Sequence, residues 1–198
     1  AVSAHPFVAN VPAGQYRITV ASGKEYRPWV KTAAVKRNGV LQLEIQLKRW
    51  IHMAEEGWFS GDTHVHLPVK ELATFVAAED LNIAFPMTGW VTRGFDSPLP
   101  SYSKQTGRIE KELVRIDDRH LIHPLNTEWE IFTVNGKRHT LGAVFAIGHK
   151  EPFTAGAPPV TPIARETRRQ GGLLELDKHN WPWSMMIIPV MDVDLFEL

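Results

Sequence analysis

The sequence predicts an α/β protein that is preceded by a small β segment. In residues 40–47 (Val-Leu-Gln-Leu-Glu-Ile-Gln-Leu), apolar and polar side chains alternate, which is typical of a half-buried strand. Residues 57–88 have the pattern of a strand, a helix and a second strand, and this order favours parallel pairing. Farther along the chain, histidines and glutamates lie near the ends of predicted strands, where α/β folds build their sites.

The composition is that of an ordinary folded chain. Its 198 residues are 43% apolar and 22% charged, which suits one domain with a small appendage. Lys plus Arg equals Asp plus Glu, at 22 each, so no net charge favours nucleic acid or an anionic membrane surface. No apolar run approaches the ~20 residues that span a bilayer. We therefore expect no nucleic acid or membrane partner, and the oligomeric state stays open.

The chain contains no cysteine. This excludes disulfides and thiolate zinc sites, and it leaves His, Asp and Glu as the strong metal ligands. The small residues at positions 1–4 are compatible with a signal-peptide cleavage region, which would suit a secreted or periplasmic protein but does not assign the compartment. The sequence stops at Phe196-Glu197-Leu198 without a tail, so we expect the domain to continue past this point.

The first 50 residues predict the end of a β-sandwich-like domain. Predicted strands cover residues 16–20, 26–35 and 40–47. Asn38-Gly39 supplies a hairpin turn between the last two. Three strands are too few for a sandwich, which normally needs about seven, so the segment is also compatible with a small sheet that leans on the next domain. Residues 49–56 predict a connector with one helical turn, and the second domain is expected over residues 57–198.

The second region alternates strands and helices. Predicted strands cover residues 57–66, 83–88, 113–116, 121–125, 129–134, 140–147 and 173–177, and predicted helices cover residues 69–82 and 161–170. Residues 89–107 are rich in Gly, Pro and Ser and predict a loop. Asn135-Gly136 predicts a hairpin turn.

A pair of histidines separated by one residue is the strongest indication of function. The stretch over residues 61–66 is Gly-Asp-Thr-His-Val-His. In a strand, residues i and i+2 project from the same face, so His64 and His66 present two imidazoles side by side. Neutral imidazole is a common ligand for zinc and a good one for iron. Such a pair also arises by chance or in a hydrogen-bonded core, so the meaning depends on further ligands.

Further ligand types lie near strand ends in the second region. Glu128 precedes the strand at residues 129–134, His139 follows the predicted hairpin, and His179 follows the strand at residues 173–177. The carboxyl ends of parallel strands meet at one edge of a sheet, so groups that are distant in sequence can converge there.

These residues, in this order, resemble the polymerase-and-histidinol-phosphatase (PHP) superfamily of metal-dependent hydrolases, in its CehA/McbA-type branch. The family's opening Gly-Asp-x-His-x-His signature matches residues 61–66, and its next carboxylate ligand matches Glu128. A histidine before a small apolar strand matches His139, and a Gly-Gly strand that ends in a histidine matches residues 171–179. The resemblance implies a partial or distorted (β/α)7 barrel of the PHP type over residues 57–198.

Two departures from the family pattern affect this expectation. The family's second strand usually ends in Thr-Asp-His, whereas this chain has Met87-Thr88-Gly89-Trp90 at the matching place. The family's last ligand would lie beyond Leu198. These departures leave room for fewer than the two or three ions of the family site. The loss of the last ligand is compatible with weak metal binding and with an inactive chain, so the resemblance leaves the activity open.

The resemblance implies hydrolysis of a small-molecule substrate of the phosphate-ester class, by water that a divalent Zn, Mn or Fe ion activates. The implied metal ligands are His64, His66, Glu128, His139 and His179. Asp62 is expected to hold a ligand imidazole in the right tautomer. Lys178 would neutralise an anionic substrate or leaving group, although a surface ion pair is the simpler interpretation of this residue.

Two other interpretations remain open. A non-catalytic PHP-like binding module with a structural or vestigial metal site would explain the missing Asp-His after Thr88, and Trp181 and Trp183 would suit carbohydrate or a partner protein. A purely structural β-rich fragment would explain the first 50 residues but would leave the histidine pattern accidental. Metal-dependent turnover would count against both.

Overall fold

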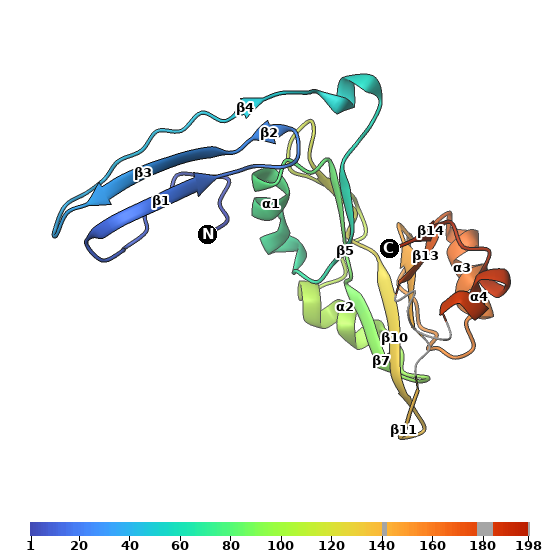
Figure 1. Cartoon of the computed structure of the whole chain (residues 1–198). Coiled ribbons are helices and arrows are strands. Elements are labelled where there is room, and N and C mark those ends of the chain that lie inside the picture. The colour runs from blue at the N-terminus through green and yellow to red at the C-terminus, as the bar shows by residue number, and fades with distance from the viewer. Residues whose placement is uncertain (140–141, 178–183, 198) are drawn as a thin grey trace.

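Residues 1–139, 142–177 and 184–197 are described by a computed structural model of the chain (Figure 1). The helices in these ranges are α1 (Val69–Ala78), α2 (Leu99–Thr106), α3 (Thr161–Gln170) and α4 (Ser184–Met191), with a single 3-10 turn η1 (Met53–Glu56). None of these helices has the length and apolar character that crossing a membrane requires. The predicted helices that begin at Val69 and Thr161 and the helical turn before residue 57 are confirmed.

The first 50 residues form two small antiparallel sheets. Their strands are β1 (Gly14–Val20), β2 (Tyr26–Arg27), β3 (Trp29–Val35) and β4 (Lys48–Arg49). β1 pairs with β3 and β2 pairs with β4. Figure 1 shows the β1–β3 ribbon reaching away from the rest of the chain. The predicted strand at residues 40–47 is wrong, because this segment pairs with no strand of the described residues. The expected sandwich-like segment is also wrong, because no second sheet covers the β1–β3 ribbon in those residues.

The second region begins with a four-stranded sheet. Its strands, in spatial order, are β5 (Gly61–Val65), β6 (Ile83–Pro86), β9 (Leu121–Ile122) and β8 (Val114–Arg115). β5 and β6 are parallel and α1 connects them, which confirms the predicted strand-helix-strand unit. Buried Leu72 and Val76 of α1 pack with Ala84 and Ile122 of the sheet. This packing fixes β5, which carries His64 and leads directly into His66.

A six-stranded sheet forms the other half of the second region. Its strands are β7 (Gly89–Arg93), β10 (Thr127–Val134), β11 (Lys137–Arg138), β12 (Ala143–Ile147), β13 (Leu173–Asp177) and β14 (Leu195–Phe196). β10, β12 and β13 are consecutive antiparallel neighbours, whereas β7 joins β10 and β14 joins β13 in parallel. Residues 89–107 hold β7 and α2, so the predicted loop there is wrong.

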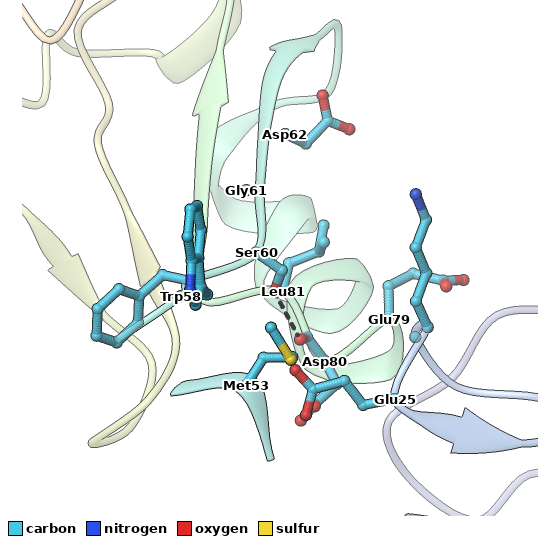
Figure 2. A pocket seen from close by; sticks show the side chains of 12 residues that line it. Glu25, Met53, Trp58, Ser60, Gly61, Asp62, Glu79, Asp80 and Leu81 are labelled. Atoms are coloured by element: carbon cyan, nitrogen blue, oxygen red, sulfur yellow. Dashed lines mark hydrogen bonds between the residues drawn. The ribbon is translucent and has the colours of Figure 1, made fainter. Parts of the chain in front are cut away.

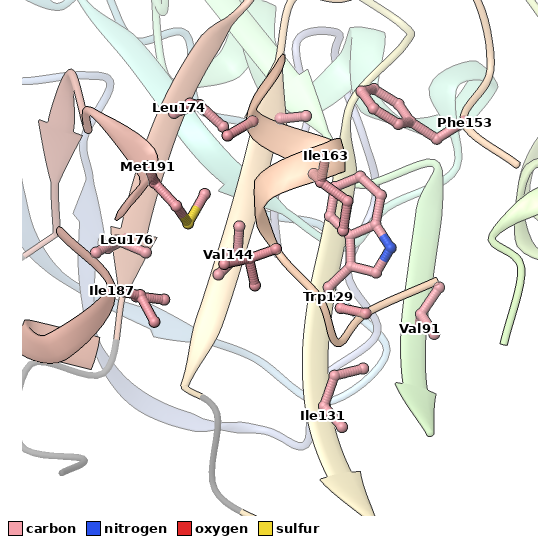
Figure 3. Packing of buried hydrophobic residues seen from close by; sticks show 14 residues of the cluster. Val91, Trp129, Ile131, Val144, Phe153, Ile163, Leu174, Leu176, Ile187 and Met191 are labelled. Carbon is pink, nitrogen blue, oxygen red and sulfur yellow. The ribbon is translucent and has the colours of Figure 1, made fainter. Parts of the chain in front are cut away.

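Side-chain alternation gives the six-stranded sheet two different faces. Trp129, Val144 and Leu174 belong to the apolar cluster with Ile163 of α3 and Met191 of α4 (Figure 3). Because successive side chains in a strand point to opposite faces, Glu128, Phe145 and Glu175 project away from that cluster. Thr63 of β5 hydrogen-bonds to Glu175, so this second face meets the β5 strand.

The expected (β/α)7 barrel is wrong. In the described part of the chain, the strands form separate small sheets of mixed direction, and no barrel closes. A barrel of that type needs a helix between successive parallel strands. Here β10, β12 and β13 are joined as an antiparallel sheet, and such pairs do not require crossover helices.

Candidate metal centre

His64 of β5 and His66, which directly follows this strand, lie over three neighbouring strands of the six-stranded sheet. Glu128 of β10 is paired in register with Phe145 of β12 on one side and with Trp90 of β7 on the other. The His64 ring contacts the Phe145 ring edge-on, with 4.8 Å between centroids. The His66 ring contacts Trp90 in the same way, at 4.9 Å. Both imidazoles therefore flank the Glu128 carboxylate.

Three donor atoms meet at this point. His66 Nε2 lies 2.9 Å from Glu128 Oε2, His64 Nε2 lies 3.6 Å from the same oxygen, and the two Nε2 atoms are 3.1 Å apart. A tetrahedral zinc ion bound at ~2.0–2.1 Å would separate its ligand atoms by ~3.3 Å. The three distances lie on either side of that value, so these residues fit one face of a tetrahedral metal site.

The Glu128 carboxylate is buried without the hydrogen bonds that such a group normally has. Its side chain is 0% exposed, and neither oxygen makes a hydrogen bond of good geometry in the described structure. Burial would raise the pKa of Glu128, but its interactions with His64 and His66 outweigh burial and lower that pKa. Glu128 also makes the largest contribution in raising the pKa of His64 to about 9, against the effect of burial and with a further contribution from Glu197. A buried carboxylate that lies beside two imidazoles offers donor atoms that could hold a divalent cation.

A second set of acidic residues lies on the other side of the His64 ring. His64 Nδ1 is 3.1 Å from Glu197 Oε2, and Asp177 joins these two in a group whose ligand atoms all lie within 4.8 Å of one another. Glu175 is buried nearby, and burial, together with the charges of Glu197 and Asp177, raises its pKa. Thr63 donates a hydrogen bond to Glu175 Oε1 at 3.1 Å.

Sequence reasoning missed these three acidic residues. The alternation in Leu173-Leu174-Glu175-Leu176-Asp177 does place Glu175 and Asp177 on one face, opposite the buried leucines. Glu197 offers no comparable signal, because it reaches the site only through the parallel pairing of β14 with β13.

Asp62 lies apart from the three donor atoms. The pairing of β5 with β6 shifts register between Asp62 and Val65, so the simple alternation that would place Asp62 beside His64 does not hold. Asp62 Oδ1 accepts a hydrogen bond from the His64 backbone N–H at 3.0 Å. Asp62 therefore holds the backbone of His64 by a hydrogen bond, whereas the sequence predicted that it would hold the imidazole.

The Asp62 side chain also lines a pocket of about 690 Å³ (Figure 2). Trp58, Glu25 and Asp80 are among the other lining residues, whereas His64, His66 and Glu128 are not. This pocket is thus distinct from the three-donor group, and Trp58 and Phe59 at its wall are largely exposed.

His139 belongs to neither potential ligand group in the described structure. Its backbone N–H donates to the Phe132 carbonyl, four residues along β10 from Glu128, which corresponds to ~13 Å of strand at ~3.3 Å per residue. Lys178 and His179 lie outside the described residues. The structure therefore brings His64, His66 and Glu128 together from the predicted set.

Comparisons of this chain with protein-family models, with curated proteins and with solved structures find no match.

Proposed function

We propose that this chain is a metal-dependent hydrolase of the phosphoesterase-like kind, with a divalent cation held by His64, His66 and Glu128. The observation that carries the proposal is the triangle of two imidazole nitrogens and one carboxylate oxygen, with sides of 2.9, 3.1 and 3.6 Å. The resemblance of residues 61–66 to the PHP signature supports the same proposal.

The residues present fit a catalytic site better than a closed structural one. Three protein ligands leave a tetrahedral cation one further position for water or substrate, as in hydrolytic zinc enzymes. The His66 side chain is 36% exposed, so solvent reaches one of the three proposed ligands. Zn²⁺, Mn²⁺ and Fe²⁺ all accept a set of two imidazoles and a carboxylate.

When bound, such a cation supplies a water whose pKa is lowered toward ~7, and it takes up charge on a phosphoryl oxygen. His64 and His66 would offer neutral nitrogens, and Glu128 would contribute one negative charge from a fully buried position. The Phe145 ring packs edge-on against His64 and excludes water from that side of the imidazole, which strengthens the electrostatic interactions there. An anionic phosphate ester suits the remaining positive charge of the cation.

The test measures metal content and hydrolysis in the same protein. We expect the purified chain to bind Zn²⁺ or Mn²⁺ and to hydrolyse a nitrophenyl phosphate ester only when that metal is present. His64→Ala, His66→Ala and Glu128→Gln should each lose metal and at least ~100-fold in rate. His52→Ala is the matched control, because His52 is exposed beside η1 and lies outside the ligand groups. Absence of metal from the wild type, or equal losses in the control, would end the proposal.

A second candidate function is metal binding without catalysis. The observation that favours it is Trp90, which packs on His66 in the segment where the PHP pattern would have Asp and His. A tryptophan contributes no ligand, so the centre has fewer donors than the family site. Tight metal binding with no turnover of phosphate monoesters or diesters would favour this candidate over the hydrolase.

A further inference from the structure

Both ring nitrogens of His64 have acidic neighbours, on opposite sides of the imidazole. Nε2 faces Glu128 and His66, whereas Nδ1 lies 3.1 Å from Glu197 Oε2. Glu197 is held in place because its backbone N–H donates to the Leu176 carbonyl at 2.9 Å, next to the parallel pairing of β14 with β13. The contact joins positions 133 residues apart in the sequence.

This arrangement determines which nitrogen of a neutral His64 carries the proton. A carboxylate only accepts hydrogen bonds, so the contact with Glu197 places the hydrogen on Nδ1. The Nε2 lone pair is then directed toward Glu128 and His66, where a cation would need it. Ligating histidines commonly donate their other N–H to a carboxylate, which fixes the ring and makes the ligand nitrogen more basic.

We propose that Glu197 is a positioning residue that sets the tautomer and ring orientation of His64 for cation binding at Nε2. This inference rests on the proposed metal centre of His64, His66 and Glu128. The sequence assigns that role to Asp62, but the Asp62 carboxylate accepts the backbone N–H of His64 at 3.0 Å. The two acidic residues thus have separate tasks, since Asp62 holds the main chain of the ligand and Glu197 holds its ring.

The surroundings of Glu197 support a hydrogen-bonding role. The Glu197 side chain is 40% exposed, so its charge remains partly hydrated, whereas Glu175 beside it is buried. The alternative is that Asp177 and Glu197 are themselves ligands of a second cation, because they form a group with His64. In that case Glu197 would control the number of bound ions instead of the affinity of one ion.

The experiment compares Glu197→Gln and Glu197→Ala with the wild type and with Glu112→Gln. Glu112 is an exposed residue between α2 and β8, so its substitution removes one negative charge at the surface. Zn²⁺ affinity and stoichiometry are measured by competition with a chromophoric chelator. The His64 tautomer is measured in the Zn²⁺-loaded protein by long-range ¹H–¹⁵N correlation spectra.

We expect one Zn²⁺ per wild-type chain, with the His64 proton on Nδ1. Glu197→Ala should weaken Zn²⁺ binding about 10- to 100-fold. Glu197→Gln should keep the tautomer and lose less affinity, because its amide oxygen still accepts from Nδ1. Glu112→Gln should match the wild type.

The failures of the two proposals are distinguishable. A wild-type chain that binds no Zn²⁺ would overturn the metal centre itself. Zn²⁺ binding that Glu197→Ala leaves unchanged, or a wild-type His64 with its proton on Nε2, would overturn the positioning role and leave the centre intact. A second Zn²⁺ that disappears in both Glu197 variants would make Glu197 a ligand, which also contradicts the positioning role.

Discussion

Thr127 connects two buried polar side chains directly behind the candidate ligand Glu128. Its hydroxyl is in hydrogen-bond contact with the Tyr102 hydroxyl and lies 2.9 Å from His149 Nε2. His149 Nδ1 lies 2.9 Å from the Glu151 carbonyl oxygen. The bonds are consistent with one direction, in which Tyr102 donates to Thr127, Thr127 to His149 and His149 Nδ1 to Glu151. Burial raises the pKa of Tyr102 to about 12, so it remains a neutral donor.

Thr127→Val should therefore destabilise the protein although it keeps the side-chain shape. The change leaves the Tyr102 hydroxyl and His149 Nε2 without their shared partner, at a cost of about 1–3 kcal/mol in the free energy of unfolding. Thr127→Ser is the control, because it keeps the hydroxyl and removes only a methyl group. Urea unfolding of both variants checks the prediction, and a serine variant as unstable as the valine variant would contradict it.

His149 should make stability depend on pH in the acidic range. Burial is the main cause that lowers its pKa to about 3, whereas an unfolded histidine titrates near ~6.5. As the pH falls below ~6.5, the unfolded chain takes up a proton at this position and the folded chain does not. His149 therefore lowers the free energy of unfolding by about 1.4 kcal/mol for each unit that the pH falls, until the pH approaches the pKa of His149 in the folded protein.

The measurement is the free energy of urea unfolding between pH 7.5 and 4.5, for the wild type and His149→Gln. The difference between the two should change with pH by the slope given above, because all other groups are common to both proteins. Parallel pH curves would show that His149 is protonated in the folded protein or that its site is open to water.

At the scale of residues, the sequence predicted the candidate donors that the structure brings together. The i, i+2 spacing places His64 and His66 side by side, and Glu128, which the family resemblance implied, lies with them. The same spacing rule failed for Asp62, which was expected beside the His64 ring but bonds to the His64 backbone, because the pairing of β5 shifts register next to it. Glu197 was beyond reach of any local rule, since its contact with His64 depends on how β14 pairs.

At the scale of elements, β7 shows how a strand can form in a sequence typical of a loop. It contains Gly89 and pairs in parallel with β10, with Gly89 opposite Thr127. A Cβ at position 89 would lie 2.7 Å from Cζ of Tyr102 on α2 and 3.0 Å from Oγ1 of Thr127. The glycine is therefore needed for the close approach of β7 to α2, and composition alone does not distinguish this use from a loop.

Gly89→Ala should destabilise the chain by about 1–3 kcal/mol, because the added methyl group meets a fully buried tyrosine ring. Gly14→Ala is a matched strand control, since a Cβ there meets only Tyr16 at ordinary contact distances of 3.7 Å and more. Thermal unfolding of the two variants provides the comparison. An equal effect of both substitutions would mean that β7 and α2 move apart at little cost.

The segment at residues 40–47 shows the opposite case. Its alternation is the clearest in the first 50 residues, yet it forms no strand. Alternation describes which side chains would share a face, but a strand also needs a neighbour for its backbone N–H and C=O groups. β1 and β3 pair with each other, and the segment at residues 40–47 forms no backbone ladder with either of them.

At the scale of the whole molecule, the expectation of a barrel failed because it depended on how sheets join. Local patterns predicted most strands and the first parallel pair, β5 with β6. The hairpin signal at Asn135-Gly136 indicated an antiparallel connection after β10. No local pattern indicated that β12 would also pair antiparallel with β13, or that the sheets would remain separate in the described residues. The group of His64, His66 and Glu128 does not depend on a closed barrel, because it requires only that the end of β5 lies beside β10.

The N-terminal ribbon should behave as a weakly protected part of the chain. A two-stranded ribbon is only marginally stable by itself, and β1–β3 has no third strand in the described structure. In contrast, all five residues of β12 are buried between β10 and β13. Hydrogen exchange followed by mass spectrometry should therefore find the amides of β12 protected much longer than those of β1 and β3.

Arg49 is the main charged link between the N-terminal segment and the second region. It pairs with Glu25 at 2.5 Å, contacts Asp80 just after α1, and stacks on the Tyr26 ring at 4.3 Å. Arg49→Ala should remove these contacts at once and speed hydrogen exchange in β2 and β4, with no change in β12. Arg93→Ala is the control, because it breaks an exposed ion pair with Asp96, and such pairs contribute little to the free energy of unfolding. If hydrogen exchange in β12 rises together with that in β2, the N-terminal segment and the second region unfold as one cooperative unit. The distinction between the stabilities of these two parts would then be wrong.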